Sequence, residues 1–409
     1  MRISKHAFFG YAFVITIFTK LAGVHIDHLG TFDLYAYPVL TLIVLIYPPK
    51  LKVLVIYSII WGLFLVANII VKLYLSLSLF PLFKQFVPIF IIYLSALSFL
   101  GRTDIKELFK YYVNVAFYLS VFGIVQFCLY FLGISISNNP RFIVSIGSLS
   151  LMRISSLLPE PSHFALVIIP AFIYLLMSHG MFKIRTIIIL LTLLLTLSAT
   201  SYITIVVTLF LYYFGRVRLK SVIGFSFVIV FSIISYYSIE PIRFRINETI
   251  KYFDIRDFDN NTNVSTFSLV SNLYVSLHSI RQSPLFGVGL GGHEETYYDY
   301  FRRMDLSNFQ ELYDRRGGIN STSGHSLLIR TISEMGVITI LLVLWYLLRF
   351  RQRPMKNEYF AISLACLSYF LARCFKIGGY FDFGLYFFVI AYYCSYAQNK
   401  AEAYSHHFS

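Results

Sequence analysis

The sequence predicts an all-α, polytopic integral membrane protein with about twelve transmembrane helices and a large loop on the outer face. Composition is the first reason, because 57% of the 409 residues are hydrophobic, only 13% are charged, and the mean hydropathy is +0.70. The apolar runs are the second reason. Stretches such as VLVIYSIIWGLFLVANIIV reach the ~20 apolar residues that cross the hydrocarbon core of a bilayer. No soluble domain has this pattern.

Twelve apolar segments are expected to be helical. They lie near 7–24, 31–48, 53–75, 84–101, 109–133, 163–179, 185–198, 200–215, 221–238, 325–348, 358–374 and 379–397. The run from Thr186 to Gly215 is divided because it is too long for one ordinary span and the polar sequence SATS interrupts it. The first segment has a basic start but no convincing cleavage site after it, so we expect a retained helix.

Basic residues support this map. With the N-terminus inside, the loops richest in Lys and Arg all fall on the cytoplasmic side, as the positive-inside rule requires. These residues are Arg2, Lys5, Lys50, Lys52, Arg102, Lys106, Lys110, Lys183, Arg185, Arg216, Arg218, Lys220, Arg349, Arg351, Arg353 and Lys356. The net charge of +14 is therefore mainly a result of topology and gives no reason to expect a nucleic-acid partner.

The map divides the chain into three parts. Residues 1–238 hold helices one to nine and an outer-face segment at 134–162, residues 239–324 form the large outer loop, and residues 325–409 hold the last three helices. Within the loop, FSLVSNLYVSLHSI has apolar residues at helical spacing, which predicts an amphipathic helix on the membrane surface.

The same loop contains SPLFGVGLGGHEE, in which Gly287, Gly289 and Gly292 have the GxGxxG spacing of dinucleotide sites. The segment follows an amphipathic helix instead of a strand and faces outward, so we set NAD and ATP aside. The four cysteines lie in apolar segments without a CxxC pair, which indicates neither a disulfide framework nor a zinc site. We therefore expect no metal and no other cofactor.

Ionisable residues gather at two outer helix ends. MRISSLLPEPSHFAL brings Arg153 and Glu160 to the start of the sixth helix, and TSGHSLLIRTISEMG places His325 at the start of the tenth, with Glu334 nine residues on. Arg before Glu-Pro-Ser, SPLFGVGLG in a large outer loop, and Gly-His-Ser followed by Glu-x-Gly together resemble the O-antigen polymerase and ligase superfamily. The resemblance covers mainly residues 150–340.

Glu160-Pro161-Ser162 is similar to the polymerase (Wzy) branch, and Arg281 precedes Gly292 at the Arg-x10-Gly spacing described for polymerases. Arg141 and Arg153 in the first outer segment do not reproduce that spacing. The resemblance implies a GT-C-like, inverting, metal-independent glycosyltransferase in the bacterial inner membrane, with its site facing the periplasm. Its partners would be undecaprenyl-diphosphate-linked glycans as donor and acceptor, the bilayer and a chain-length regulator of the Wzz co-polymerase type.

Such chemistry needs cations for the diphosphate and a base for the attacking hydroxyl. We assign Arg281 and Arg153 to the diphosphate, because guanidinium offers bidentate donors. His325 is expected to be the base or to orient the acceptor, and Glu160 to orient an arginine or to be the base itself. Gly287, Gly289 and Gly291 would let backbone N–H groups approach an anion or a sugar.

Each assignment has a structural alternative. His325 could be only a residue of the cap region at a helix start, and Arg153 could extend from a helix end to the interface. Arg281 could contact lipid head groups, and Glu160 could complement the dipole of its helix. The glycine segment could be a tight turn, and Glu334 could be either a site residue or the buried partner of an arginine. Among functions, an O-antigen ligase uses the same chemistry on a lipid A core acceptor. A carrier or flippase is less compatible with charges gathered in one asymmetric outer loop and with the lack of an internal repeat.

Overall fold

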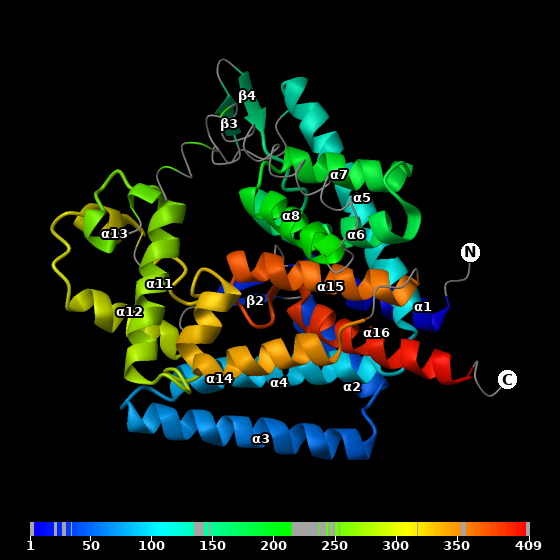
Figure 1. Cartoon of the computed structure of the whole chain (residues 1–409), viewed down its shortest axis with the longest axis horizontal. Coiled ribbons are helices and arrows are strands. Elements are labelled where there is room, and N and C mark those ends of the chain that lie inside the picture. The colour runs from blue at the N-terminus through cyan, green and yellow to red at the C-terminus, as the bar shows by residue number, and fades with distance from the viewer. Residues whose placement is uncertain are drawn as a thin grey trace.

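The structure, a computed structural model, describes residues 4–19, 23–26, 30–33, 35–134, 143–146, 149–214, 250–252, 254–316, 318–352 and 357–405, and the single residues 237, 243 and 247. Figure 1 shows long helices side by side, with α11, α12 and α13 at one end of the molecule and both chain termini at the other. The first half contains α1 (Lys5–Ile15), α2 (Ala36–Ile46), α3 (Leu51–Tyr74), α4 (Phe80–Leu100), α5 (Ile105–Phe131), α6 (Pro161–His179), α7 (Ile184–Leu195) and α8 (Ala199–Phe214). The second half contains η3 (Ile255–Asp257), α11 (Val264–Gln282), α12 (Gly292–Arg302), α13 (Gln310–Arg316), α14 (Leu327–Arg349), α15 (Glu358–Phe375), η4 (Asp382–Gly384) and α16 (Leu385–Ser405).

Among the described residues, six helices are long and apolar enough to cross a membrane, namely α3, α4, α5, α6, α14 and α15. Three shorter apolar helices, α2, α7 and α8, accompany them. The chain is therefore a multi-pass helical membrane protein, but the prediction of twelve spans is not confirmed. The predicted helix at 221–238 lies outside the described residues. The division of the run 186–215 is confirmed, because α7 ends at Leu195 and α8 begins at Ala199.

The first two helices are shorter than predicted. The predicted helix 7–24 ends at Ile15, and the predicted helix 31–48 begins only at Ala36, because a hairpin of β1 (Gly23–Ile26) and β2 (Gly30–Asp33) lies between them. A second antiparallel hairpin, β3 (Ile143–Ile146) with β4 (Leu149–Met152), lies in the predicted outer segment. The all-α fold class is confirmed, and the two short hairpins are additions to the helical body that the sequence did not predict.

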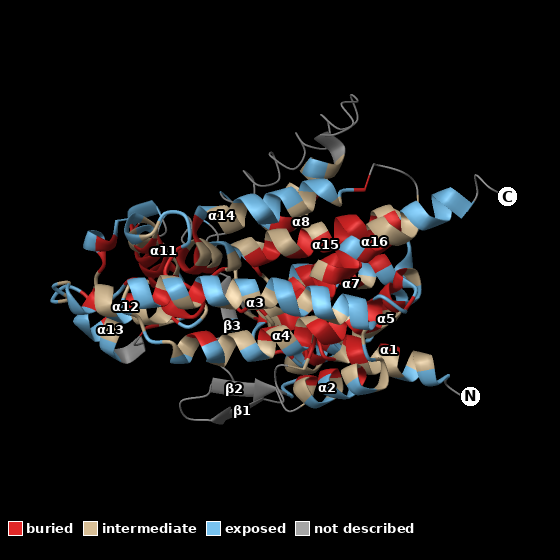
Figure 2. Ribbon diagram, turned by 90° about the horizontal axis from the view of Figure 1, so that it is seen from below, coloured by how far each residue is buried: buried red, intermediate tan, exposed pale blue. Residues whose placement is uncertain are grey.

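The core surrounds α6, which packs against α15 and α7. In its most apolar window 78% of the residues are buried, and the hydroxyl of Tyr112 on α5 donates to Val167 O at 2.6 Å. By contrast α3 has only 11% of its window buried and packs on α4, so most of its ribbon is exposed or intermediate in Figure 2. An apolar helix with so much exposed surface is suited to contact lipid.

The segment between α8 and α14 has a small core of its own. The expected amphipathic helix is present as α11, but its apolar face does not lie open to a membrane surface. Phe267 and Val270 are buried against Phe258, Phe301 and Phe309. The periodicity therefore correctly predicted a helix with one apolar face, while the surface that covers this face comes from parts of the same loop both before and after the helix.

Candidate active site at the outer end of the helices

Glu160 and Lys376 form an ion pair at the end of the helices that the positive-inside rule predicts to be outer. The two residues are 216 positions apart, yet Lys376 Nζ lies 3.2 Å from Glu160 Oε2. Ser162 joins them, because its hydroxyl lies 2.6 Å from Lys376 Nζ and donates to Glu160 Oε2 at 3.0 Å. Glu160 is the N-cap of α6, with Pro161 in the first turn, and Lys376 is the C-cap of α15. Two helix ends therefore fix this pair.

His325 lies beside the same loop, directly before α14. Its carbonyl accepts from the Ile377 N–H at 2.7 Å, and its Nδ1 lies 2.9 Å from the Ser268 hydroxyl of α11. The backbone of His325 has a φ of 61°, a region that residues other than glycine rarely adopt and that often marks functional positions. The side chain is buried, so burial and the contact with Ser268 fix the position of the imidazole.

A glycine allows this close approach. An added Cβ on Gly378 would lie 1.7 Å from Ser323 O, so only glycine permits the segment after Lys376 to pack against the segment before His325. The two segments come from different parts of the chain and meet without space for a side chain. We call the set Glu160, Ser162, Lys376 and His325 the outer cluster.

The charges of the outer cluster are set by its own contacts. Burial would raise the pKa of Glu160, but Lys376 and His163 outweigh burial and hold the pKa at about 2. Burial and the nearby Lys376 lower the pKa of His325 to about 4, against the opposing influence of Glu160. At neutral pH the cluster therefore contains a carboxylate, an ammonium group and a neutral imidazole that can accept a proton.

Glu334 is the partner of a buried arginine, one of its two expected alternatives. Arg330 Nε donates to Glu334 Oε1 at 3.2 Å, with both side chains almost completely buried. The same guanidinium donates to Gly378 O at 3.3 Å and to the side-chain oxygen of Gln85, and it lies over the Tyr380 ring at 4.5 Å. This network attaches the segment after Lys376 to α14 and α4. It therefore helps to hold Lys376, a member of the outer cluster, in position.

The glycine segment packs into a break in α14. Gly336 has non-helical φ and ψ, and at this point the Val288 N–H donates to Ser333 O and the Val337 N–H donates to Pro284 O. A Cβ on Gly287 would lie 2.4 Å from Ser333 O. Gly289 and Gly291 also have positive φ, and they approach Lys72 of α3 and Pro81 of α4. These contacts favour the tight-turn alternative; glycan or anion binding by the three glycines stays a prediction.

The two predicted arginine ligands lie on other elements. Arg153 Nε donates to Thr196 O at 3.0 Å, in the turn between α7 and α8. Arg281 is exposed in the last turn of α11. Their roles at a diphosphate stay predictions.

Lys376 and Arg330 were not among the expected site residues. A signal for Lys376 existed in the sequence, because it lies between two predicted helices on the side that the positive-inside rule leaves poor in basic residues. Arg330 had the i, i+4 spacing to Glu334 that allows an ion pair on one helix face. No group of three or more His, Cys, Asp or Glu residues with the arrangement of a metal site occurs in the described part of the chain.

The fold and the outer cluster define a helical membrane protein with an ionisable site at one end of its helices. Residues 184–344 match the protein family described as O-antigen ligase (Wzy_C), a range that includes α11, the glycine segment, His325 and Glu334. No curated protein matches the chain. The family match supports the O-antigen polymerase and ligase superfamily and a membrane enzyme of surface-polysaccharide biosynthesis with lipid-linked glycan substrates. It does not separate polymerase from ligase.

Proposed function

We propose that the protein is a glycosyltransferase of the bacterial inner membrane that polymerises undecaprenyl-diphosphate-linked repeat units at its periplasmic end. The observation that carries this proposal is the meeting of Glu160, Lys376 and His325 from three distant segments of the chain. The match of residues 184–344 supports the general class of reaction. Undecaprenyl diphosphate, periplasmic orientation and a Wzz-type regulator are parts of the proposal.

In the proposed reaction, an acceptor sugar hydroxyl attacks the anomeric carbon of the donor glycan. The new glycosidic C–O bond forms as the bond from that carbon to the diphosphate oxygen breaks, and the lipid diphosphate leaves with the electron pair. His325 accepts the hydroxyl proton, and Lys376 stabilises the negative charge of the leaving group. Glu160 holds Lys376 in place. Attack from the face opposite the leaving group inverts the anomeric configuration.

The choice of base follows from the two pKa values. A pKa of about 2 makes Glu160 a poor proton acceptor, while His325 starts at about 4. A diphosphate bound at Lys376 would bring negative charge close to His325, and negative charge raises the pKa of an imidazole. Donor binding would therefore make His325 a better base at the moment when a base is needed.

A ligase is the second candidate, because the matching family is described as O-antigen ligase. The two functions differ only in the acceptor. Purified protein in proteoliposomes would receive radiolabelled lipid-linked repeat units, with or without lipid A core, and the products would be separated on a gel. A ladder from repeat units alone supports the polymerase. Label transferred only to lipid A core supports the ligase, and silence in both reactions favours a carrier.

Metal independence is a separate prediction. The proposed mechanism uses Lys376 for charge stabilisation and His325 for proton transfer, so transfer should proceed at an unchanged rate in excess EDTA. The measurement is the initial rate of product formation before and after chelation. Loss of transfer in EDTA with recovery after addition of a divalent ion would contradict the mechanism.

Arg281 is proposed as a second ligand of the diphosphate. Substitution of Arg281 by Lys keeps the charge but removes the planar pair of donors, so transfer should fall roughly tenfold. Substitution by Ala should lower it further. The comparison uses Arg256→Lys as a control, because Arg256 is also exposed in the outer segment. Wild-type rates in Arg281→Lys would remove the bidentate contact from the proposal.

A further inference from the structure

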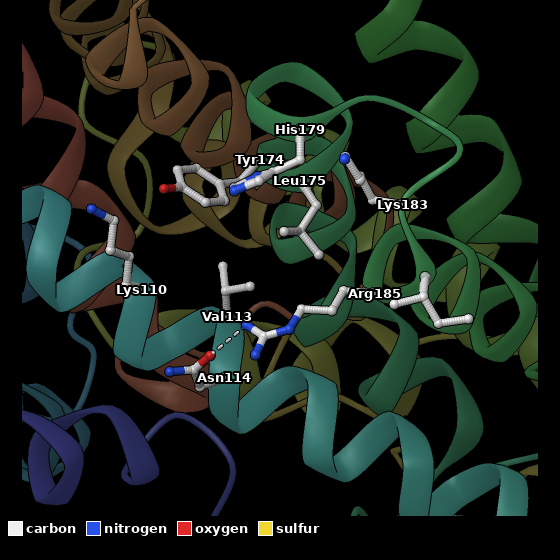
Figure 3. A pocket seen from close by; sticks show the side chains of 9 residues that line it. Lys110, Val113, Asn114, Tyr174, Leu175, His179, Lys183 and Arg185 are labelled. Atoms are coloured by element: carbon white, nitrogen blue, oxygen red, sulfur yellow. Dashed lines mark hydrogen bonds between the residues drawn. The ribbon is translucent and has the colours of Figure 1, made fainter.

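The helices enclose a second polar site, at the end opposite the outer cluster. Glu160 caps the start of α6 and His179 ends it. A helix of 19 residues spans about 28 Å, which separates the two sites by nearly the thickness of a bilayer core. At the His179 end, a cavity of about 500 Å³ opens between α5, α6 and α7, as shown in Figure 3. The positive-inside rule predicts this end to be cytoplasmic.

The cavity is lined by cations from two helices and the loop between α6 and α7. Lys110 comes from α5, Lys183 from the end of the loop, as the N-cap of α7, and Arg185 from the first turn of α7. Arg185 Nη1 donates to Asn114 Oδ1 at 3.0 Å, which directs the guanidinium across the cavity toward α5 (Figure 3). Lys110 Nζ lies 3.3 Å from Glu358 Oε1, and this carboxylate offsets one of the three positive charges. The cavity thus has an excess of positive charge.

The surface next to the cavity is apolar. Phe182 and Ile184, on either side of Lys183, have 94% and 69% of their surface exposed. Ile187, Leu191 and Leu194 are also exposed and continue from Ile184 along one face of α7, at helical spacing. A soluble anion would make no contact with this apolar surface. A lipid would, because its acyl chains can lie along α7 while its phosphate enters the cavity.

We propose that the cavity binds the head group of an anionic phospholipid, with the acyl chains along the exposed apolar face of α7. Basic pockets between membrane helices on the cytoplasmic side are suited to anionic head groups, which are abundant in that leaflet. Charge complementarity selects an anionic lipid over a zwitterionic one. The proposal does not depend on the glycosyltransferase mechanism, because none of these residues belongs to the outer cluster.

Native mass spectrometry of the purified full-length protein tests this site. The probes are phosphatidylglycerol, phosphatidylethanolamine and inorganic phosphate. Lys183 and Arg185 are both exposed, so the Lys183→Gln/Arg185→Gln double variant should fold, and its thermal unfolding is checked in the same detergent. The control is Lys50→Gln/Lys52→Gln, which removes the same charge from exposed residues on the same predicted face but outside the cavity.

We expect wild-type protein and the control to retain phosphatidylglycerol equally, and the double variant to bind it about thirtyfold more weakly. Lys183→Gln alone should lose about sixfold. Phosphatidylethanolamine should bind more weakly than phosphatidylglycerol, and millimolar inorganic phosphate should not displace the bound lipid. Equal losses in variant and control would show a general charge effect and overturn the proposal. Displacement by inorganic phosphate would show a site for free anions and would overturn it as well.

Discussion

Replacement of His325 by alanine is expected to lower glycan transfer by about 10²–10⁴-fold, the usual contribution of a general base. His325 is buried, held by Ser268 and positioned at the loop that carries Lys376. The measurement is the initial rate of transfer from lipid-linked repeat units in proteoliposomes. His278→Ala is the matched control, because His278 is also in the outer segment and lies on the same helix as Ser268.

The pH profile gives a readout that a purely structural role would not produce. His325 must be neutral to accept a proton, and its pKa in the free protein is about 4. The rate at low substrate concentration should therefore stay constant as pH falls through 6.5 and decline only near 4. An undiminished rate in His325→Ala, or an acid limb near 6.5 in the wild type that persists in this variant, would exclude His325 as the base.

Replacement of Arg330 by leucine is expected to destabilise the fold by roughly 3–5 kcal/mol, because it leaves the Glu334 carboxylate buried without its partner. The measurement is thermal unfolding of the purified protein in detergent. Replacing both residues, as Arg330→Leu/Glu334→Leu, should restore most of the stability. The control is Arg303→Ala, which breaks an exposed pair with Asp299 and should cost at most about 1 kcal/mol. Equal effects of the two single substitutions would contradict a structural role for Arg330.

The long helices could be predicted from sequence because the length of an apolar run fixes them locally. The limits of α1 and α2 could not, because they depend on the pairing of β1 with β2, which the length of an apolar run does not reveal. The break in α14 could not be predicted either, because it also depends on contacts between residues distant in the sequence. Gly336 stands inside a segment predicted to be one continuous helix, and its non-helical backbone is explained only by the segment around Gly287, which packs against it.

The candidate site could be predicted only in part. His325 and Glu160 were identified by residue type and by resemblance, and the structure places both next to Lys376. Lys376 itself was missed because its relation to Glu160 depends on how α6 and α15 pack, 216 residues apart in sequence. The role of Glu334 was left open for a similar reason. Its environment is formed by Arg330 together with Tyr380, which lies far along the chain.

The central claim is that lipid-linked glycans react at the outer cluster, and a chain-length ladder from wild type, Lys376→Ala and Lys376→Arg tests it most directly. Loss of a charge-stabilising donor should lower transfer by about 10²–10³-fold in Lys376→Ala, while Lys376→Arg keeps the cation and should retain part of the ladder. Lys251→Ala is the control, a basic residue exposed in the outer segment. The account predicts a ladder in the wild type and the control that disappears in Lys376→Ala. An undiminished ladder in Lys376→Ala would contradict it.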